Sequence, residues 1–231
     1  MEEARSIADG THPKLAGLEA DEMEKRKEMY EGAPLGNLTY ERVDQTFRFI
    51  MNQVDNMSMK KSRELKIGQL TELANRYDDD AWGIREQGIN LQKRPSPETM
   101  ASYFETAVDL CSVSSSNTAE KSDANHLPGG TALVATSTLI GYIKSTGTDY
   151  QNLGRWSWMQ LEGEAGHRTR IIQAYAVGNN KSKQLGSTHQ QSMRYIQTHG
   201  LQTTPKDLMI DDLCRQVQIW VRQGDRIVLE Y

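Results

Sequence analysis

Segments of strand type and of helix type alternate along this chain, and their order limits the folds that it can adopt. Residues 46–52 alternate β-branched and aromatic side chains, and residues 81–85 form a short apolar run, so both read as strands. Between them, residues 62–77 space apolar side chains three and four positions apart, which predicts an amphipathic helix. A strand, a helix and a strand in this order favour two parallel neighbours in one sheet.

The rest of the chain adds further strands and helices to this beginning. A loop rich in Ser, Asn and Asp is expected over residues 112–125, and Gly163 to Gly166 favour a hairpin. Thr204 is the expected N-cap and Gly224 the expected end of the last helix. Strands are predicted at 131–137, 155–161, 168–177 and 226–229, and helices at 97–110, 187–199 and 205–223. We therefore expect an α/β (α+β) sheet protein.

Composition limits the class of protein further. The 231 residues suffice for one large domain or two small ones, and 37% are hydrophobic. No apolar run approaches the roughly 18 residues that a membrane helix needs, and residues 1–6 are polar. Two cysteines about a hundred residues apart form neither a disulfide framework nor a CxxC metal pair. We expect an intracellular protein, nuclear or cytoplasmic, that is neither secreted nor membrane-bound.

The first 40 residues differ in composition from the remainder. Residues 19–31 are dense in charge and poor in apolar side chains, which is typical of a disordered or loosely helical segment. Glycine and proline then punctuate residues 32–36. The sequence thus predicts an extension over residues 1–40 and a folded domain over 41–231.

Charge is unevenly distributed over the chain. The formal net charge is −4, yet residues 151–200 hold six Lys and Arg against two acidic residues. Such a basic segment could be one lobe of a phosphate-binding surface or an ordinary solvated surface.

Polar side chains follow the first two predicted strands. Asn52, Asp55 and Asn56 come at the end of the first, and Glu86 follows the second. If these strands are parallel neighbours, the acidic groups emerge at the same edge of the sheet. Oxygen ligands at one edge suit a hard cation such as Mg²⁺, although acidic residues after strands are common without any metal.

The familiar one-line motifs of phosphate loops, dinucleotide folds, zinc proteases and serine hydrolases are not found in the sequence. Gly129-Gly130 precedes a strand and reads as a turn. Tyr175, at the end of the 168–177 strand, is either a half-buried sheet residue or a hydroxyl directed at a phosphate.

Five segments in order carry a resemblance to a known family. They are RFIMNQVDNMS, DDDAWGIREQGIN, HLPGGTALVATS, GRWSWMQLEGEAGHRTRIIQAYAVGNN and RQGDRIVL. Over residues 44–231 the chain resembles the endonuclease/exonuclease/phosphatase superfamily, and within it the apurinic-type endonuclease domain of non-LTR retroelements. The resemblance implies a two-sheet sandwich with outer helices and a magnesium-dependent (or manganese-dependent) endonuclease or phosphodiesterase acting on DNA. It also implies a reverse transcriptase domain downstream as a possible partner.

The resemblance assigns roles to particular residues. Glu86 would bind the metal, together with Asp55 or, through a one-residue shift, Asn52. Tyr175 would orient the scissile phosphate, and Asn179 or Asn180 would contact it.

The chain also departs from the family pattern. The Asp-x-Asn expected after residues 226–229 does not follow them, and none of the five histidines stands in a Ser-Asp-His motif. Arg85 replaces the glutamine that usually precedes Glu86. These departures predict a C-terminally truncated domain that is inactive or nearly so, with an exposed edge beside Val228 and Leu229 that favours aggregation.

Two other interpretations remain. The chain could be a non-catalytic α/β module that binds nucleic acid or protein through its basic segment. It could instead be a degenerate retroelement copy or a split gene model without a function of its own.

Overall fold

The residues that the computed structural model describes all lie in one compact unit, residues 47–231. The described residues are 47, 49–53, 57, 66–72, 80–93, 110–163, 166–175, 177–178 and 187–230. The predicted extension over residues 1–40, and its boundary with the domain, lie outside them.

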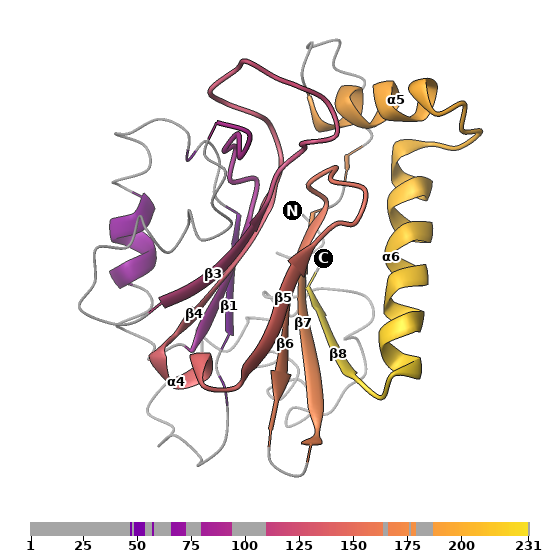
Figure 1. The fold of residues 1–231 in the computed structure, drawn as a ribbon. Helices are drawn as coiled ribbons and strands as arrows, with labels where there is room; N and C mark the ends of the chain where they lie inside the picture. The colour runs from indigo at the N-terminus through magenta and orange to yellow at the C-terminus, as the bar shows by residue number, and fades with distance from the viewer. Residues whose placement is uncertain are drawn as a thin grey trace, which may run out of the picture. The chain divides into compact units, whose positions relative to one another are not determined.

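The first sheet has the strand order β1-β2-β4-β3, and Figure 1 labels its strands β1, β3 and β4. Its strands are β1 (Phe49–Gln53), β2 (Ala81–Arg85), β3 (Leu110–Ser115) and β4 (Thr131–Thr136). β1 and β2 run parallel, with Asn52 opposite Ile84, while β4 runs antiparallel to both β2 and β3. The parallel pairing predicted from the alternating segments is confirmed, and a helical stretch at residues 66–72 lies within the connection.

The second sheet has the order β5-β6-β7-β8. Its strands are β5 (Ile143–Thr148), β6 (Trp156–Glu162), β7 (Arg168–Ala174) and β8 (Arg226–Glu230). β5, β6 and β7 are antiparallel neighbours, which confirms the hairpin at the glycines of residues 163–166. β8 pairs with β7 in parallel and forms an edge, where Val228 and Leu229 are 44% and 43% exposed.

In the described part of the chain, helices α4 (Ser137–Ile140), α5 (Thr188–Thr198) and α6 (Pro205–Arg222) accompany the strands. The side chains of Ser187 and Thr204 cap α5 and α6 by accepting from the backbone N–H three residues on. Gly224, at φ +89°, then turns the chain from α6 into β8, a backbone angle that glycine adopts without a Cβ clash. The predicted N-cap, Thr204, and the predicted end of α6 at Gly224 are therefore confirmed.

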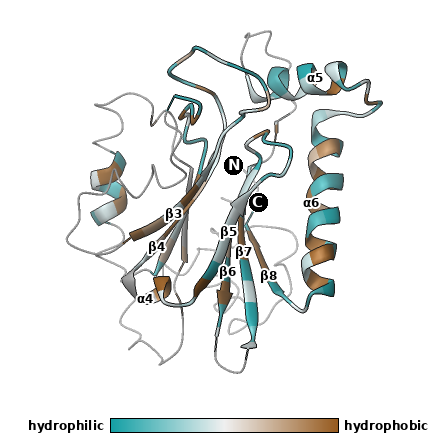
Figure 2. Ribbon diagram, in the orientation of Figure 1, coloured by the Kyte–Doolittle hydropathy of each residue, from teal (hydrophilic) through white to brown (hydrophobic). Residues whose placement is uncertain are grey.

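Hydrophobic and hydrophilic residues alternate along α6 and along the strands (Figure 2), and the buried hydrophobic ones form separate clusters. One buried cluster joins the two sheets face to face and includes Leu133 of β4 and Met159 of β6. A second cluster lies on the other face of the first sheet, around Trp82 and Ile84. A third packs Trp220 of α6 against the second sheet. The predicted fold class, an α/β sandwich of two sheets with helices outside, is confirmed.

Two strands escaped the sequence prediction. Residues 112–115, expected as part of a loop, belong to β3, since their small side chains Ser112, Ser114 and Ser115 are buried against β4. β5 was missed as well, because its sequence IKSTGT is polar and its burial incomplete. The predicted helix at 97–110 lies outside the described residues except for Leu110, which begins β3. None of the described helices is long and apolar enough to span a membrane.

Candidate functional site

Glu86 stands directly after β2 in an uncommon backbone conformation. Its φ is +57°, in the left-handed region where a residue with a Cβ is disfavoured. The turn is fixed by backbone hydrogen bonds: Glu86 N–H donates to the Gly130 carbonyl at 2.9 Å, and Gly88 N–H donates to the Gly129 carbonyl at 3.0 Å. A strained residue that its surroundings hold in place is typical of functional sites.

The Glu86 carboxylate meets a side chain from the other sheet. Tyr175, the first residue after β7, donates its hydroxyl hydrogen bond to Glu86 Oε1. The two residues are 89 positions apart in the chain, and both side chains are partly buried. The structure therefore brings together two residues that the sequence singled out separately.

A glycine pair lies between these residues and α5. A Cβ on Gly130 would come within 2.7 Å of the Ser115 carbonyl, and one on Gly129 within 2.8 Å of Thr188 Oγ1. Both glycines have φ +85°. The glycine pair directly precedes β4, as the sequence indicated, and the close packing shows why glycine is needed here.

Gln87 holds the Glu86 turn in place through its side-chain hydrogen bonds. It was not identified as a site residue from the sequence. Its side chain is fully buried, and Nε2 donates to the carbonyls of Ser115 at 2.7 Å and Thr131 at 3.1 Å. The backbone carbonyl of Gln87 accepts a hydrogen bond from Met57 N–H at 2.8 Å. The residue beside Glu86 therefore fixes the turn to both β3 and β4.

The remaining predicted site residues are described only in part. Asn52 lies in β1, one register position short of the strand end, so it approaches the same sheet edge as Glu86. Nothing is described of its side chain. Asp55, Asn179 and Asn180 lie outside the described residues, so their proposed roles stay predictions.

The ligand type at this edge, a carboxylate oxygen, is one that hard divalent cations bind. Glu86 offers a carboxylate at the end of a parallel strand pair, and Mg²⁺ uses one or two carboxylates together with waters. Within the described part of the chain, no group of three or more His, Cys, Asp or Glu is placed to hold a metal. A second oxygen ligand would come from Asn52 or from residues beyond that part, and the remaining ligands from water or substrate.

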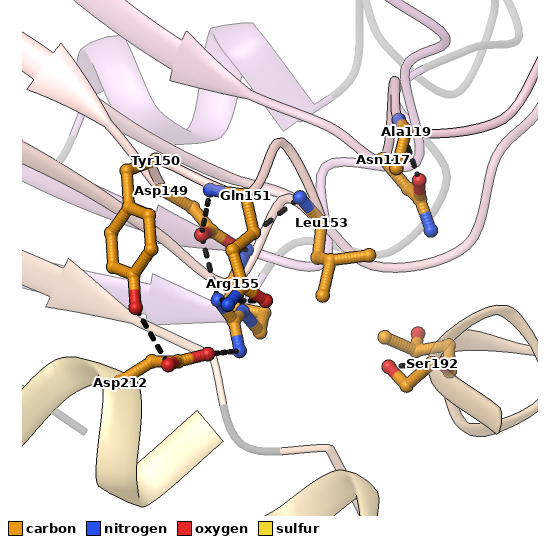
Figure 3. Close-up of polar contacts among 10 residues, drawn as sticks. Asn117, Ala119, Asp149, Tyr150, Gln151, Leu153, Arg155, Ser192 and Asp212 are labelled. Carbon is orange, nitrogen blue, oxygen red and sulfur yellow. Dashed lines mark hydrogen bonds and ion pairs between the residues drawn. The ribbon is translucent and has the colours of Figure 1, made fainter. Parts of the chain in front are cut away.

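Figure 3 shows a buried ion cluster in which Arg155 lies between Asp149 and Asp212. Arg155 N–H groups donate to Asp149 at 2.6 and 2.8 Å and to Asp212 of α6 at 2.8 Å. All three side chains are at most 3% exposed. The Arg155 carbonyl accepts from Tyr175 N–H at 2.8 Å, so this cluster fixes the backbone that carries the Tyr175 hydroxyl.

The electrostatics of the cluster favour the charged guanidinium. Burial alone would lower the pKa of Arg155, but the hydrogen bonds and negative charges of Asp149 and Asp212 outweigh it and raise that pKa. Tyr150 donates its hydroxyl to Asp212 at 2.6 Å. Burial, then this hydrogen bond and the Asp212 charge, raise the pKa of Tyr150 to about 12.

Three arginines of the basic segment, residues 151–200, have carboxylate partners within the described part of the chain. Arg155 is paired as described, and Arg168 and Arg170 both pair with Asp225, at 3.0 and 2.7 Å. The Arg170 guanidinium also lies over the Trp158 and Trp220 rings, 4.2 and 4.3 Å from their centroids. For these three arginines the interpretation as an open phosphate-binding lobe is wrong, because their partners come from other segments.

Comparisons with known proteins give distant structural similarities. No protein-family model and no curated protein matches the chain. An AP endonuclease from Leishmania major is similar over 59% of this chain and 41% of its own, with 13% identity and a TM-score of 0.43. A 3′ phosphatase, NExo, from Neisseria, bound to a product DNA hairpin, is similar over 80% and 56%, with 15% identity and a TM-score of 0.47.

The catalytic domain of APE2 from Xenopus laevis is similar over 71% of this chain and 54% of its own, with 12% identity and a TM-score of 0.38. The chain spans about half the length of these solved structures. At such identities and TM-scores, any function of this chain rests on its own residues.

Proposed function

We propose that residues 47–231 form part of a metal-dependent phosphodiester hydrolase domain of the endonuclease/exonuclease/phosphatase type, derived from a retroelement, which binds nucleic acid at the Glu86–Tyr175 edge. The hydrogen bond between these two side chains carries the proposal. The two residues come from motifs that the sequence resemblance assigns to metal binding and to phosphate orientation, and two different sheets bring them together.

Each residue has a distinct task in this proposal. A bound divalent cation would polarise a phosphate and stabilise charge on the leaving oxygen. Glu86 would hold the cation with its carboxylate, and Asn52 or Asp55 would add a second oxygen. Tyr175 would orient a phosphate oxygen through its hydroxyl, from a backbone position that the Arg155 carbonyl fixes. Asn179 or Asn180 would contact the same phosphate.

We further propose that this chain by itself binds nucleic acid but cleaves it poorly. The family resemblance places water activation on an aspartate and on the histidine of a Ser-Asp-His motif, and none of the five histidines follows Ser-Asp. Each general acid or base contributes roughly two to four orders of magnitude to rate. The protein would act inside the cell, in the nucleus or the cytoplasm.

Two measurements on the full chain test this function. Fluorescence anisotropy with a labelled DNA duplex should show binding that Mg²⁺ strengthens in the wild type and does not strengthen in Glu86→Gln. Incubation with supercoiled plasmid and Mg²⁺ should show little or no nicking. Efficient nicking that Glu86→Gln abolishes would disprove poor cleavage while supporting the site.

The second candidate is a non-catalytic binding module. The exposed side chains of Lys93, Lys121 and Arg194, at the 116–130 loop and on α5, favour it. Salt-dependent binding that Mg²⁺ and Glu86→Gln leave unchanged would select this candidate.

A further inference from the structure

A pocket of about 410 Å³ lies beside the Glu86 turn, between the loop that joins β3 to β4 and helix α5. Its size falls within the range of small-ligand sites, roughly 300–1,000 Å³. Arg194 and Lys121 contribute positive charge, Asn117 and Gln191 contribute side-chain amides, and Leu127 and Pro128 contribute apolar surface. None of these residues belongs to the proposed Glu86–Tyr175 site.

The loop that walls this pocket is long and irregular, yet it is held in place. It runs from residue 116 to residue 130, and loops of this length without regular structure are usually functional or disordered. The buried Asn90 donates through Nδ2 to the carbonyls of Ser122 at 3.0 Å and Ala124 at 2.7 Å. Ser122 N–H in turn donates to Gln92 Oε1 at 3.0 Å. The wall is therefore formed before any ligand arrives.

The start of the loop is tied to the second sheet. Thr118 and Ala119 donate backbone hydrogen bonds to the Asn152 carbonyl at 2.7 and 3.1 Å. Asn152 has φ +59°, and it belongs to the turn that Asp149 and Arg155 hold. The pocket and Tyr175 thus depend on the same buried cluster.

The end of the loop connects the pocket to the candidate site. Pro128 lines the pocket, and the next two residues, Gly129 and Gly130, accept the backbone hydrogen bonds of the Glu86 turn. Leu127 N–H donates to the Gly88 carbonyl at 3.1 Å. A ligand in the pocket would therefore contact the loop end that leads directly into the glycine pair of the Glu86 turn.

The Arg194 guanidinium in the pocket can change its anionic partner. Gln191 and Arg194 are three residues apart and share one face of α5. Arg194 Nε lies 3.4 Å from Glu120 Oε2, with side chains 50% and 40% exposed. Exposed pairs of this kind contribute little to stability, so a phosphate can replace the Glu120 carboxylate as the partner of Arg194.

We propose that this pocket binds one nucleotide unit of a nucleic-acid strand whose phosphate backbone passes the Glu86–Tyr175 edge. The phosphate would contact Arg194 and Lys121, and the base would lie on the apolar wall near Leu127 within reach of the Asn117 and Gln191 amides. The choice of a nucleotide rests on the proposed function, whereas the pocket, its charge and its amides do not.

The test follows backbone amide signals by NMR while 5′-dAMP, inorganic phosphate or an acidic peptide is added to the full chain. We expect 5′-dAMP to shift the signals of residues 117–128 and of α5. Arg194→Gln should weaken this binding about tenfold, the effect of one charge-assisted hydrogen bond. Ala124→Leu should abolish it by filling the pocket, and Lys144→Gln, a surface cation of β5 paired with Glu162, should leave it unchanged.

Several results would overturn the proposal. They are equal binding of phosphate and 5′-dAMP, stronger binding of the acidic peptide, signal shifts elsewhere, or equal effects of Arg194→Gln and Lys144→Gln. The melting temperatures of Arg194→Gln and Ala124→Leu should match that of the wild type. Arg194→Lys should keep part of the affinity that Arg194→Gln loses, and this comparison tests the proposal even if Ala124→Leu does not fold. Glu86→Gln separates the two proposals, since it should remove metal-dependent DNA binding and leave 5′-dAMP binding in the pocket intact.

Discussion

Replacement of Arg155 by alanine should be among the most destabilising single changes in the described part of the domain. The guanidinium is 1% exposed and bridges two carboxylates, those of Asp149 and Asp212, whose side chains are 0% and 3% exposed. Without it, two negative charges stay in an environment with little water. Removal of one partner from a buried ion pair costs about 3–5 kcal/mol, because the other charge is left uncompensated.

Other contacts of the three side chains affect the free energy cost of Arg155→Ala. Asp149 keeps backbone hydrogen bonds from Gln151 and Leu153 at 3.0 and 3.2 Å, and Asp212 keeps the Tyr150 hydroxyl, so neither carboxylate is wholly unsolvated. The loss of the buried cation–π contact with Trp156, at 4.6 Å, adds up to about 2 kcal/mol and offsets what these remaining hydrogen bonds retain. We therefore expect a decrease of about 3–5 kcal/mol in the free energy of unfolding.

Equilibrium denaturation in urea, followed by tryptophan fluorescence, measures this decrease. Lys144→Ala is the matched control, because its pair with Glu162 lies at the surface and such pairs contribute about 0–1 kcal/mol. Arg155→Lys should fall between the two, since an ammonium keeps the charge but not the two-pronged contact with Asp149. A decrease below 1 kcal/mol for Arg155→Ala, no larger than for the control, would refute the reasoning.

Three further predictions concern single side chains. The Tyr150 hydroxyl should ionise near pH 12 in an absorbance titration at the phenolate band, against a pKa of 10.0 for an unperturbed tyrosine. Its contribution to the free energy of unfolding is complete below pH 10 and is lost as the pH rises toward 12. Tyr150→Phe should remove both the high-pH ionisation and this pH-dependent contribution. Gly130→Ala should lower the melting temperature, because a Cβ would lie 2.7 Å from a β3 carbonyl at φ +85°, whereas Gly141→Ala, with open space around it, should not. Gln87→Ala should destabilise the fold by about 1–3 kcal/mol, since two buried carbonyls lose their donor, and an unchanged urea midpoint would contradict this.

The sequence predicted the fold well where patterns are local. The strand β2, the helix α6 with its Thr204 cap and the β6–β7 hairpin follow from periodicity, capping and turn residues within a short window. β3 and β5 did not follow, because small polar residues such as Ser114 are buried only through pairing with a neighbouring strand. Strand pairing over long distances leaves no local pattern.

The candidate site shows the same division. Glu86 and Tyr175 were predicted because each ends a recognisable strand, and the parallel pairing of β1 and β2 followed from their connection. Gln87 could have been found only as a polar residue beside Glu86, and its two carbonyl partners lie 28 and 44 residues away. The pairing of Arg155 with Asp212, 57 residues apart, had no signal in the sequence.

The most direct test of the proposed site is a titration of Mn²⁺ followed by electron paramagnetic resonance, which counts free and bound ions. The wild type should bind Mn²⁺, and a DNA duplex should strengthen that binding. Glu86→Gln should abolish most of it, while Glu162→Gln, at the surface end of β6, should not. Equal Mn²⁺ binding by the wild type and Glu86→Gln, with both folded, would contradict the account.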